Sequence, residues 1–139
     1  MFPRIYKSAT RLLPSSIALY SSTASSSRPS AHQLHQMSVK QLVSEAIDQN
    51  KVAIFSKSYC PYCRRAKALF AESFPDVETT VFELDERDDG SDIQAYLAEL
   101  TGQRTVPNVF INKTHVGGSD AVTALHKQGG ITKLLQQEA

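Results

Sequence analysis

The sequence predicts an α/β fold in which a mixed sheet of about four strands is flanked by helices on both faces. Short runs of β-branched and aromatic residues alternate along the chain with longer stretches of helical periodicity. A strand–helix–strand order favours a parallel pair with a right-handed crossover, and a short final hairpin adds antiparallel strands. The length of 139 residues suits one domain with its own core.

The first three elements are a helix, a strand and a second helix. The first helix is predicted to be capped by Ser38 and to end at Asn50, because apolar residues recur between them at helical spacing. The run VAIFS at 52–56 is short, apolar and β-branched, which predicts a buried strand. Strong helix formers fill 64–74, and no helix breaker occurs before Pro75.

A second strand and a third helix follow. The segment TTVFELD at 79–85 is typical of a strand. The segment 91–102 predicts a helix, with Ser91 or Asp92 as its N-cap and Gly102 at the C′ position that ends it.

The C-terminal part is predicted to form a hairpin and two helices, over 108–118, 121–128 and 131–139. The Asn112-Lys113 pair is the predicted turn of the hairpin. Ser119 or Asp120 is the predicted cap of the first of these helices. The Gly129-Gly130 pair separates it from the last helix.

The first 36 residues differ in composition from the rest. They contain nine serines, no acidic residue, and four basic residues: Arg4, Lys7, Arg11 and Arg28. The remainder holds the other 11 Lys and Arg residues and all 14 acidic residues, a net charge of −3. We interpret 1–36 as an organelle transit peptide, most simply a mitochondrial one, and 38–139 as the folded domain. A disordered tail without an address is the alternative; Pro14 interrupts the apolar run that a secretory signal needs.

Met37 is the second of two methionines and lies at this boundary. Initiation there would produce the domain without its address, so we expect a mitochondrial protein with a possible second, cytoplasmic product. The alternative is an ordinary methionine in a linker.

The composition argues against two classes of partner. A formal net charge of +1 gives no reason to expect nucleic-acid binding. No stretch approaches the roughly 20 apolar residues of a membrane span, so we expect no membrane insertion. We expect a monomer.

The two cysteines of the chain, Cys60 and Cys63, lie in KSYCPYCRRA between a predicted strand and a predicted helix. A Cys-x-x-Cys pair in this position predicts redox chemistry of the thioredoxin type. Zinc would need four ligands, and the nearest histidine of the domain, His115, is more than fifty residues away. A permanent disulfide would close a loop of only two intervening residues and stabilise little.

The two thiols are not equivalent in this motif. Cys60 is predicted at the start of the helix that begins at Pro61, where free N–H groups and the helix dipole stabilise an anion. Lys57, with Arg64 and Arg65, makes the surroundings positive, so we expect Cys60 to be the nucleophile. Cys63 lies one turn further on, where it is expected to be more buried and to resolve a mixed disulfide.

CPYC, followed by TVPNVFI and VGGSD, closely resembles the dithiol glutaredoxins over 38–139. The resemblance implies the thioredoxin fold, a groove for glutathione as co-substrate, and no metal. It implies a cis peptide bond at Val106-Pro107, with the backbone of Val106 turned toward the cysteine moiety of glutathione. Thioredoxins typically carry Trp-Cys-Gly-Pro-Cys, whereas this chain has no Trp.

The resemblance also assigns the ends of the glutathione molecule. The residues that it implies are Lys57, Tyr62, Gln94, Arg104, Thr105, Val106, Pro107, Gly118, Ser119 and Asp120. Lys57, Gln94 and Arg104 would hold the glycine carboxylate, and Gly118 to Asp120 the γ-glutamyl end. Many relatives have an acid at the position of Ala121, so here either Asp120 serves both the helix start and the substrate amine, or affinity for this end of glutathione is weaker.

The function implied is glutathione-dependent reduction of protein–glutathione mixed disulfides by Cys60, and of protein disulfides by Cys60 with Cys63. Two rivals stay open. Some glutaredoxins bind a two-iron cluster between two subunits, which Pro61 disfavours here by stiffening the turn and removing an N–H. A thioredoxin-like enzyme would be recycled by a reductase rather than by glutathione.

Overall fold

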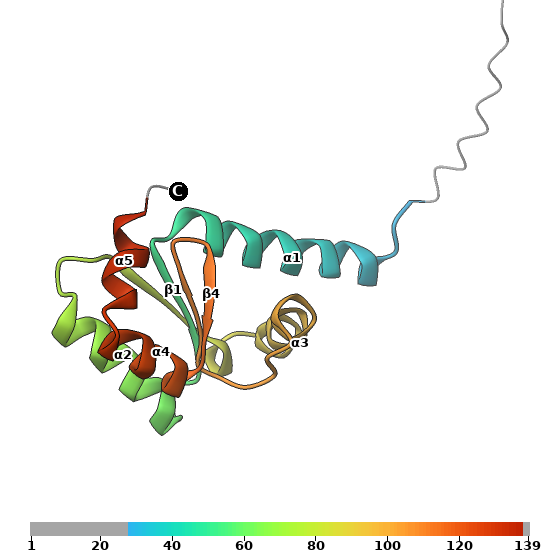
Figure 1. The fold of residues 1–139 in the computed structure, drawn as a ribbon. Coiled ribbons are helices and arrows are strands. Elements are labelled where there is room, and N and C mark those ends of the chain that lie inside the picture. The colour runs from blue at the N-terminus through green and yellow to red at the C-terminus, as the bar shows by residue number, and fades with distance from the viewer. Residues whose placement is uncertain (1–27, 138–139) are drawn as a thin grey trace, which may run out of the picture.

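The computed structural model describes residues 28–137, in which five α-helices and one short 3-10 helix accompany four strands (Figure 1). In chain order they are α1 (Ala31–Gln49), β1 (Val52–Ser56), α2 (Pro61–Ser73), β2 (Thr79–Glu83), η1 (Leu84–Glu86), α3 (Gly90–Thr101), β3 (Asn108–Ile111), β4 (Thr114–Gly117), α4 (Ser119–Lys127) and α5 (Gly130–Gln136). The predicted order of helices and strands is confirmed.

The four strands form one mixed sheet in the order β2-β1-β3-β4. β1 and β2 are parallel, with Ser56 opposite Glu83, whereas β3 is antiparallel to both β1 and β4. Helices α1 and α3 cover one face, and α2, α4 and α5 lie on the other (Figure 1). The predicted fold class, a mixed four-stranded sheet between two helical layers, is therefore correct.

Side chains of β1 alternate between the two hydrophobic cores. Ala53 and Phe55 pack with α1 and α3, while Val52 and Ile54 pack with α2, α4 and α5. All five residues of this strand are buried, as expected for a central strand covered on both faces. The alternation puts the next side chain, Ser56, on the face of α2.

The start of α1 was wrongly predicted. The helix begins at Ala31, eight residues before Val39, so the predicted boundary between transit peptide and domain falls inside it. Ser30 forms a capping box with Gln33, in which each side chain accepts a hydrogen bond from the other residue's backbone N–H. His35 lies 2.8 Å from the Asp92 carboxylate of α3, which attaches the extra turns to the domain.

Two further helix caps differ from the prediction. Asp89 and Gly118 occupy the N-cap positions of α3 and α4, and neither helix has a side-chain cap hydrogen bond. A β-carbon at Gly90 would lie 1.7 Å from the Leu84 carbonyl oxygen, so α3 starts in tight contact with η1. Close packing rather than capping therefore sets the start of α3.

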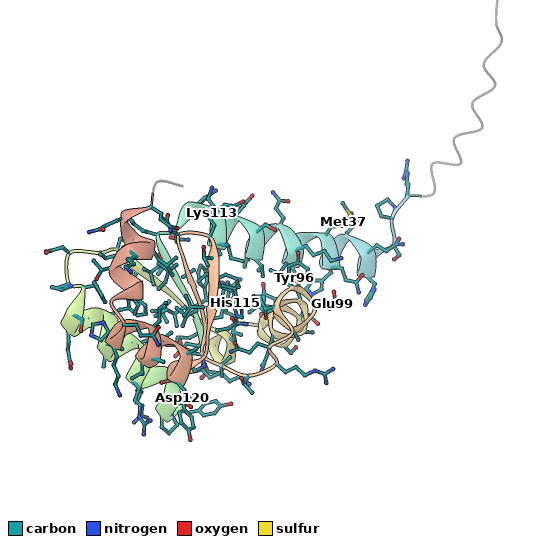
Figure 2. All side chains as sticks on the ribbon, viewed as in Figure 1. Met37, Tyr96, Glu99, Lys113, His115 and Asp120 are labelled. Atoms are coloured by element: carbon teal, nitrogen blue, oxygen red, sulfur yellow. The ribbon has the colours of Figure 1, made fainter. Side chains whose placement is uncertain are left out.

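The predicted transit segment lies outside the described residues as far as residue 27. Among helices of the described range, none has the length and apolar character required to cross a membrane. Met37 lies within α1 and is 62% exposed (Figure 2).

Candidate active site

The two thiols lie where β1 ends and α2 begins. Cys60 is the N-cap of α2 with Pro61 at the first helical position, as predicted, and both cysteines are free thiols. The Cys60 N–H donates to the Lys57 carbonyl oxygen at 3.1 Å, which closes a tight turn before the helix. The Cys60 sulfur is therefore held beside the unpaired N–H groups of the first helical turn.

Four interactions favour the thiolate of Cys60. Burial raises the pKa of this thiol, but the backbone N–H and side chain of Cys63, the N–H of Tyr62 and the charge of Lys57 together lower it below its ordinary value. The Cys63 groups have the larger effect and Lys57 the smaller one. The helix start therefore contributes more than the lysine to activation of Cys60.

Cys63 is the opposite case. Its side chain is fully buried, and burial raises its pKa, as does the neighbouring Cys60. The Lys57 N–H points at its sulfur at 3.5 Å. The structure thus holds one accessible thiol that ionises readily and one buried thiol that does not.

The loop before Cys60 is anchored by a residue that the sequence analysis missed. Both oxygens of Asp85 accept hydrogen bonds from Ser58, one from its N–H at 2.9 Å and the other from its hydroxyl. The Ser58 hydroxyl and then its N–H hold the pKa of Asp85 below its ordinary value. No local motif marks Asp85, because its contact with Ser58 depends on the parallel pairing of β1 with β2.

A hollow of about 390 Å³ has Tyr62, the residue between the two cysteines, in its lining, although neither cysteine lines it. Its lining includes seven predicted residues, Tyr62, Thr105, Val106, Pro107, Gly118, Ser119 and Asp120, together with Gln103 and Ala121. Asp120 projects at the start of α4, at the end of the molecule where α2 also begins (Figure 2). Fold topology therefore brings together groups from three separate parts of the chain.

The wall of this hollow at 103–107 offers backbone groups to a ligand. The Val106-Pro107 bond is cis. The side chain of Gln103, another residue that the sequence analysis missed, donates to the carbonyl oxygens of Thr105 at 3.0 Å and of Pro107 at 2.8 Å. Between them, the N–H and C=O of Val106 have no hydrogen-bond partner within residues 28–137.

Gln94 and Arg104 lie in a second hollow of about 440 Å³, which Ser91, Ala98 and others also line. The Gln94 amide donates to the Arg104 carbonyl oxygen at 2.8 Å, which joins α3 to the loop before β3. Lys57 lines neither hollow and lies beside the two sulfurs. The three residues predicted for one carboxylate are thus divided between two places.

Ser119 and Asp120 form the first turn of α4 but do not cap it. Ser119 is buried, Asp120 is exposed, and Gly118 precedes them as the N-cap. The prediction that these side chains cap the helix is therefore wrong. No side chain caps this helix, so the N–H groups of its first turn remain available at the hollow that Gly118, Ser119 and Asp120 line. Such a helix start suits an anionic group.

Comparison with known proteins identifies the family. A sequence profile described as Glutaredoxin matches residues 52–116. A glutaredoxin of Solanum lycopersicum is 52% identical over 93 residues, which are 67% of this chain and 84% of that protein. The chain belongs to the glutaredoxin family. Glutaredoxin-C4, chloroplastic, of Oryza sativa subsp. japonica is 44% identical over 121 residues, 84% of this chain and 90% of the relative.

Solved glutaredoxins have the same architecture. The buckwheat glutaredoxin–glutathione complex matches with a TM-score of 0.68 at 39% identity, over 77% of this chain and 94% of that one. Oxidized glutaredoxin 2 from Chlamydomonas reinhardtii matches with a TM-score of 0.67 at 40% identity, over 73% and 94%. The predicted thioredoxin fold is confirmed. Glutaredoxins are thiol oxidoreductases. Within residues 28–137, no group of three or more His, Cys, Asp or Glu side chains is arranged so that it could hold a metal ion.

Proposed function

We propose that this glutaredoxin reduces protein–glutathione mixed disulfides through Cys60 alone, and protein disulfides through Cys60 and Cys63 together. The observation that carries the proposal is the asymmetry of the two thiols at the start of α2, between which Tyr62 lines the hollow. Cys60 has a lowered pKa at the helix start, whereas Cys63 is fully buried with a raised pKa. An active nucleophile and a conditional resolving thiol suit these two routes.

In the first route, the Cys60 thiolate attacks the glutathione sulfur of the mixed disulfide. The bond to the protein sulfur breaks, and the protein leaves as a thiolate. A second glutathione thiolate then attacks the glutathione sulfur bound to Cys60, which yields glutathione disulfide and free enzyme. Cys63 takes no part in this cycle.

In the second route, Cys60 attacks a protein disulfide and forms a mixed disulfide with one protein sulfur. Cys63 then attacks the Cys60 sulfur and releases the protein as a dithiol. Two glutathione molecules reopen the Cys60–Cys63 disulfide in successive exchanges. The same two cysteines therefore serve both routes with different roles.

The hollow lined by Tyr62, Val106 and Asp120 is the proposed glutathione groove, and it suits glutathione in an extended conformation. The unpaired N–H and C=O of Val106 would pair with the cysteine moiety, as strands pair at a sheet edge. The N–H groups at the start of α4 would receive the γ-glutamyl carboxylate, and Asp120 the amine. Gln94, Arg104 and Lys57 remain the candidates for the glycine carboxylate, and Tyr62 would cover the mixed disulfide.

Two substitutions test the assignment of the thiols. Cys60→Ser is expected to abolish both activities, whereas Cys63→Ser is expected to retain deglutathionylation and lose the reduction of protein disulfides. Turnover is measured with glutathione and glutathione reductase, and separately with thioredoxin reductase. Full activity of Cys60→Ser, or turnover only with thioredoxin reductase, would contradict the proposal.

We also propose a mitochondrial location directed by residues 1–36, with a second cytoplasmic product that begins at Met37. The support is the acid-free, Arg- and Ser-bearing composition of this segment. A fusion of 1–36 to a fluorescent protein is expected to enter mitochondria; entry into another organelle would correct the address.

The Met37→Leu variant of the full chain is expected to lose its cytoplasmic pool, and an unchanged pool would exclude internal initiation.

A further inference from the structure

A connected series of hydrogen bonds runs from the edge strand β4 to the loop that forms one wall of the proposed glutathione groove. His115 Nε2 lies 2.9 Å from Asn108 Oδ1, and the Asn108 amide nitrogen donates to Thr101 Oγ1 at 3.4 Å. The N–H of Gln103 donates to the same hydroxyl oxygen at 3.1 Å. At the far end of this hydrogen-bond series, the Gln103 side chain holds the two carbonyl oxygens that flank Val106.

The fold brings Thr101, Asn108 and His115 together on one face of the sheet. Asn108 and Phe110 are two residues apart on β3, so their side chains point to the same side. That side is covered by α1 and α3, because Phe110 belongs to the core that these helices close. His115 is the register partner of Phe110 on β4, and the two rings lie 5.2 Å apart. Thr101 approaches from α3, of which it is the last residue.

Each hydrogen bond in the series fixes the orientation of the next group. An amide oxygen can only accept, so His115 Nε2 donates to Asn108 Oδ1 and the Asn108 amide nitrogen faces Thr101. The Thr101 hydroxyl donates to the Leu97 carbonyl oxygen at 2.7 Å, so its lone pairs remain available to both of its donors. Asn108 is only 1% exposed, and water therefore cannot replace the partners of its amide.

The loop that the series reaches has little support of its own. Gly102 ends α3 at φ 76°, and the residues from there to the start of β3 at Asn108 form neither helix nor strand. Among the described residues, the N–H and C=O of Val106 have no hydrogen-bond partner. A ligand that pairs with Val106 binds more tightly where these groups are already in position, because part of its binding free energy would otherwise be lost in ordering the loop.

Gln103 is the residue through which this support reaches the groove. Its backbone N–H is held by Thr101, and its side chain is held by the carbonyl oxygens of Thr105 and Pro107. A β-carbon added at Gly118 would lie 3.8 Å from Gln103 Nε2, so the same side chain also lies beside the start of α4. A displaced Gln103 backbone would therefore shift the wall of the groove that its side chain holds.

We propose that Thr101, Asn108 and His115 are positioning residues for glutathione. They fix Gln103, and Gln103 fixes the backbone of Val106 in the conformation that pairs with the cysteine moiety. None of the three lines the hollow, so they act through Gln103 rather than by contact with the ligand. The series controls how tightly glutathionylated substrates bind, whereas the reactivity of the thiols is set at the start of α2.

This inference rests on the function proposed above, so the experiment measures binding and thiol reactivity separately. The full-length protein is assayed for turnover of a glutathionylated peptide with glutathione and glutathione reductase, which gives KM for the peptide and kcat. Alkylation of Cys60 by iodoacetamide reports the reactivity of the thiol without glutathione. Amide hydrogen exchange of residues 102–107 reports how firmly the loop is held.

Thr101→Val keeps the shape of the side chain but removes its hydroxyl, so the Gln103 N–H and the Asn108 amide lose their acceptor. We expect KM to rise about three- to tenfold, as the loss of one or two hydrogen bonds implies, with kcat and the alkylation rate close to wild type and faster exchange of the loop. Thr101→Ser restores the hydroxyl and should restore KM. Thr80→Val is the matched control, because it removes a 2.7 Å hydrogen bond to Asn50 Oδ1 from β2, at the opposite edge of the sheet from β4, and should keep the wild-type KM.

An unchanged KM in Thr101→Val would overturn the proposal even if the loop exchanged faster, because the series would then be structural only. An equal rise of KM in Thr80→Val, a rise that persists in Thr101→Ser, or a fall in kcat at constant KM would overturn it as well. If Thr101→Val does not fold, His115→Phe carries the test with the same outcomes, since His115 is exposed and Phe keeps a ring against Phe110, and His115→Gln is then the variant that keeps a donor. Absence of turnover in the wild-type protein would instead count against the proposed function.

Discussion

At Cys60, burial raises the pKa of the thiol while N–H groups, the Cys63 side chain and Lys57 lower it. Among the groups that lower this pKa, the Cys63 N–H has the largest effect, followed by the Cys63 side chain, the Tyr62 N–H and the charge of Lys57. Lys57 acts on the sulfur only through its charge, which water and salt screen at a partly exposed site. The positive residues around the motif are thus a less direct cause of thiolate formation than the geometry of the helix start.

This order predicts how two substitutions shift the pKa of Cys60. Cys63→Ala removes a donor to the sulfur, and Lys57→Gln removes only a charge, so both should raise this pKa and Cys63→Ala should raise it further. A raised pKa lowers the thiolate fraction at neutral pH and slows alkylation. The measurement is the pH dependence of Cys60 alkylation by iodoacetamide, followed by mass, with Lys51→Gln as a control at an exposed lysine outside the site. A larger shift for Lys57→Gln would contradict the order.

Among the elements, turns and strands follow local chemistry closely. The hairpin turn at Asn112-Lys113 has φ values of 49° and 68°, and Gly102 ends α3 at φ 76°, all at positions that the sequence marks. Helix starts are different. Ser30 and Ser38 are equally suitable caps by local criteria, and the contact of His35 with Asp92, 57 residues away, supports the earlier start.

Some residues of the site can be predicted from local sequence, and others cannot. The cysteines are recognisable because the motif itself contains both reacting atoms and the helix start that activates one of them. Gln103 and Asp85 carry no such mark, since each acts only through a contact that the fold creates. For the residues that the sequence does predict, it does not predict their grouping. Gln94 and Arg104 lie in one hollow, whereas Tyr62 and Asp120 lie in another.

Gln103 supports the loop between α3 and β3, which forms one wall of the groove. Gln103→Ala would free the Thr105 and Pro107 carbonyls that it holds at 3.0 and 2.8 Å, so the Val106 backbone would lose its fixed position. We expect KM for a glutathionylated peptide to rise several-fold with a smaller change in kcat, because the thiols are untouched. Steady-state kinetics measure both constants, with Gln128→Ala at an exposed glutamine after α4 as the control. A fall in kcat at constant KM would argue against a binding role for this loop.

In the whole molecule, two hydrophobic cores lie on opposite faces of the sheet, and α1 closes one of them. The core residues of α1 begin at Val39, and every residue of 31–38 is exposed. These first turns depend on the Ser30 cap and the His35–Asp92 contact rather than on burial. None of residues 31–36 lines either the hollow at Tyr62 or the hollow at Gln94.

A protein that begins at Met37 should therefore fold and retain activity with slightly lower stability. It loses the Ser30 capping box, which is typically worth about 1 kcal/mol. It also loses the exposed His35–Asp92 pair, whose side chains are 50% and 56% exposed and whose contribution is small. Ser38 would stand at the new helix start and recover part of the loss.

Tm should fall by about 4–8 °C for each kcal/mol lost in a domain of this size. Thermal unfolding of 28–139 and 37–139 measures the difference, and Asp92→Asn in the longer chain gives the share of the ion pair. Equal Tm values would show that the extra turns add nothing to the domain, whereas failure of 37–139 to fold would show that its core requires them.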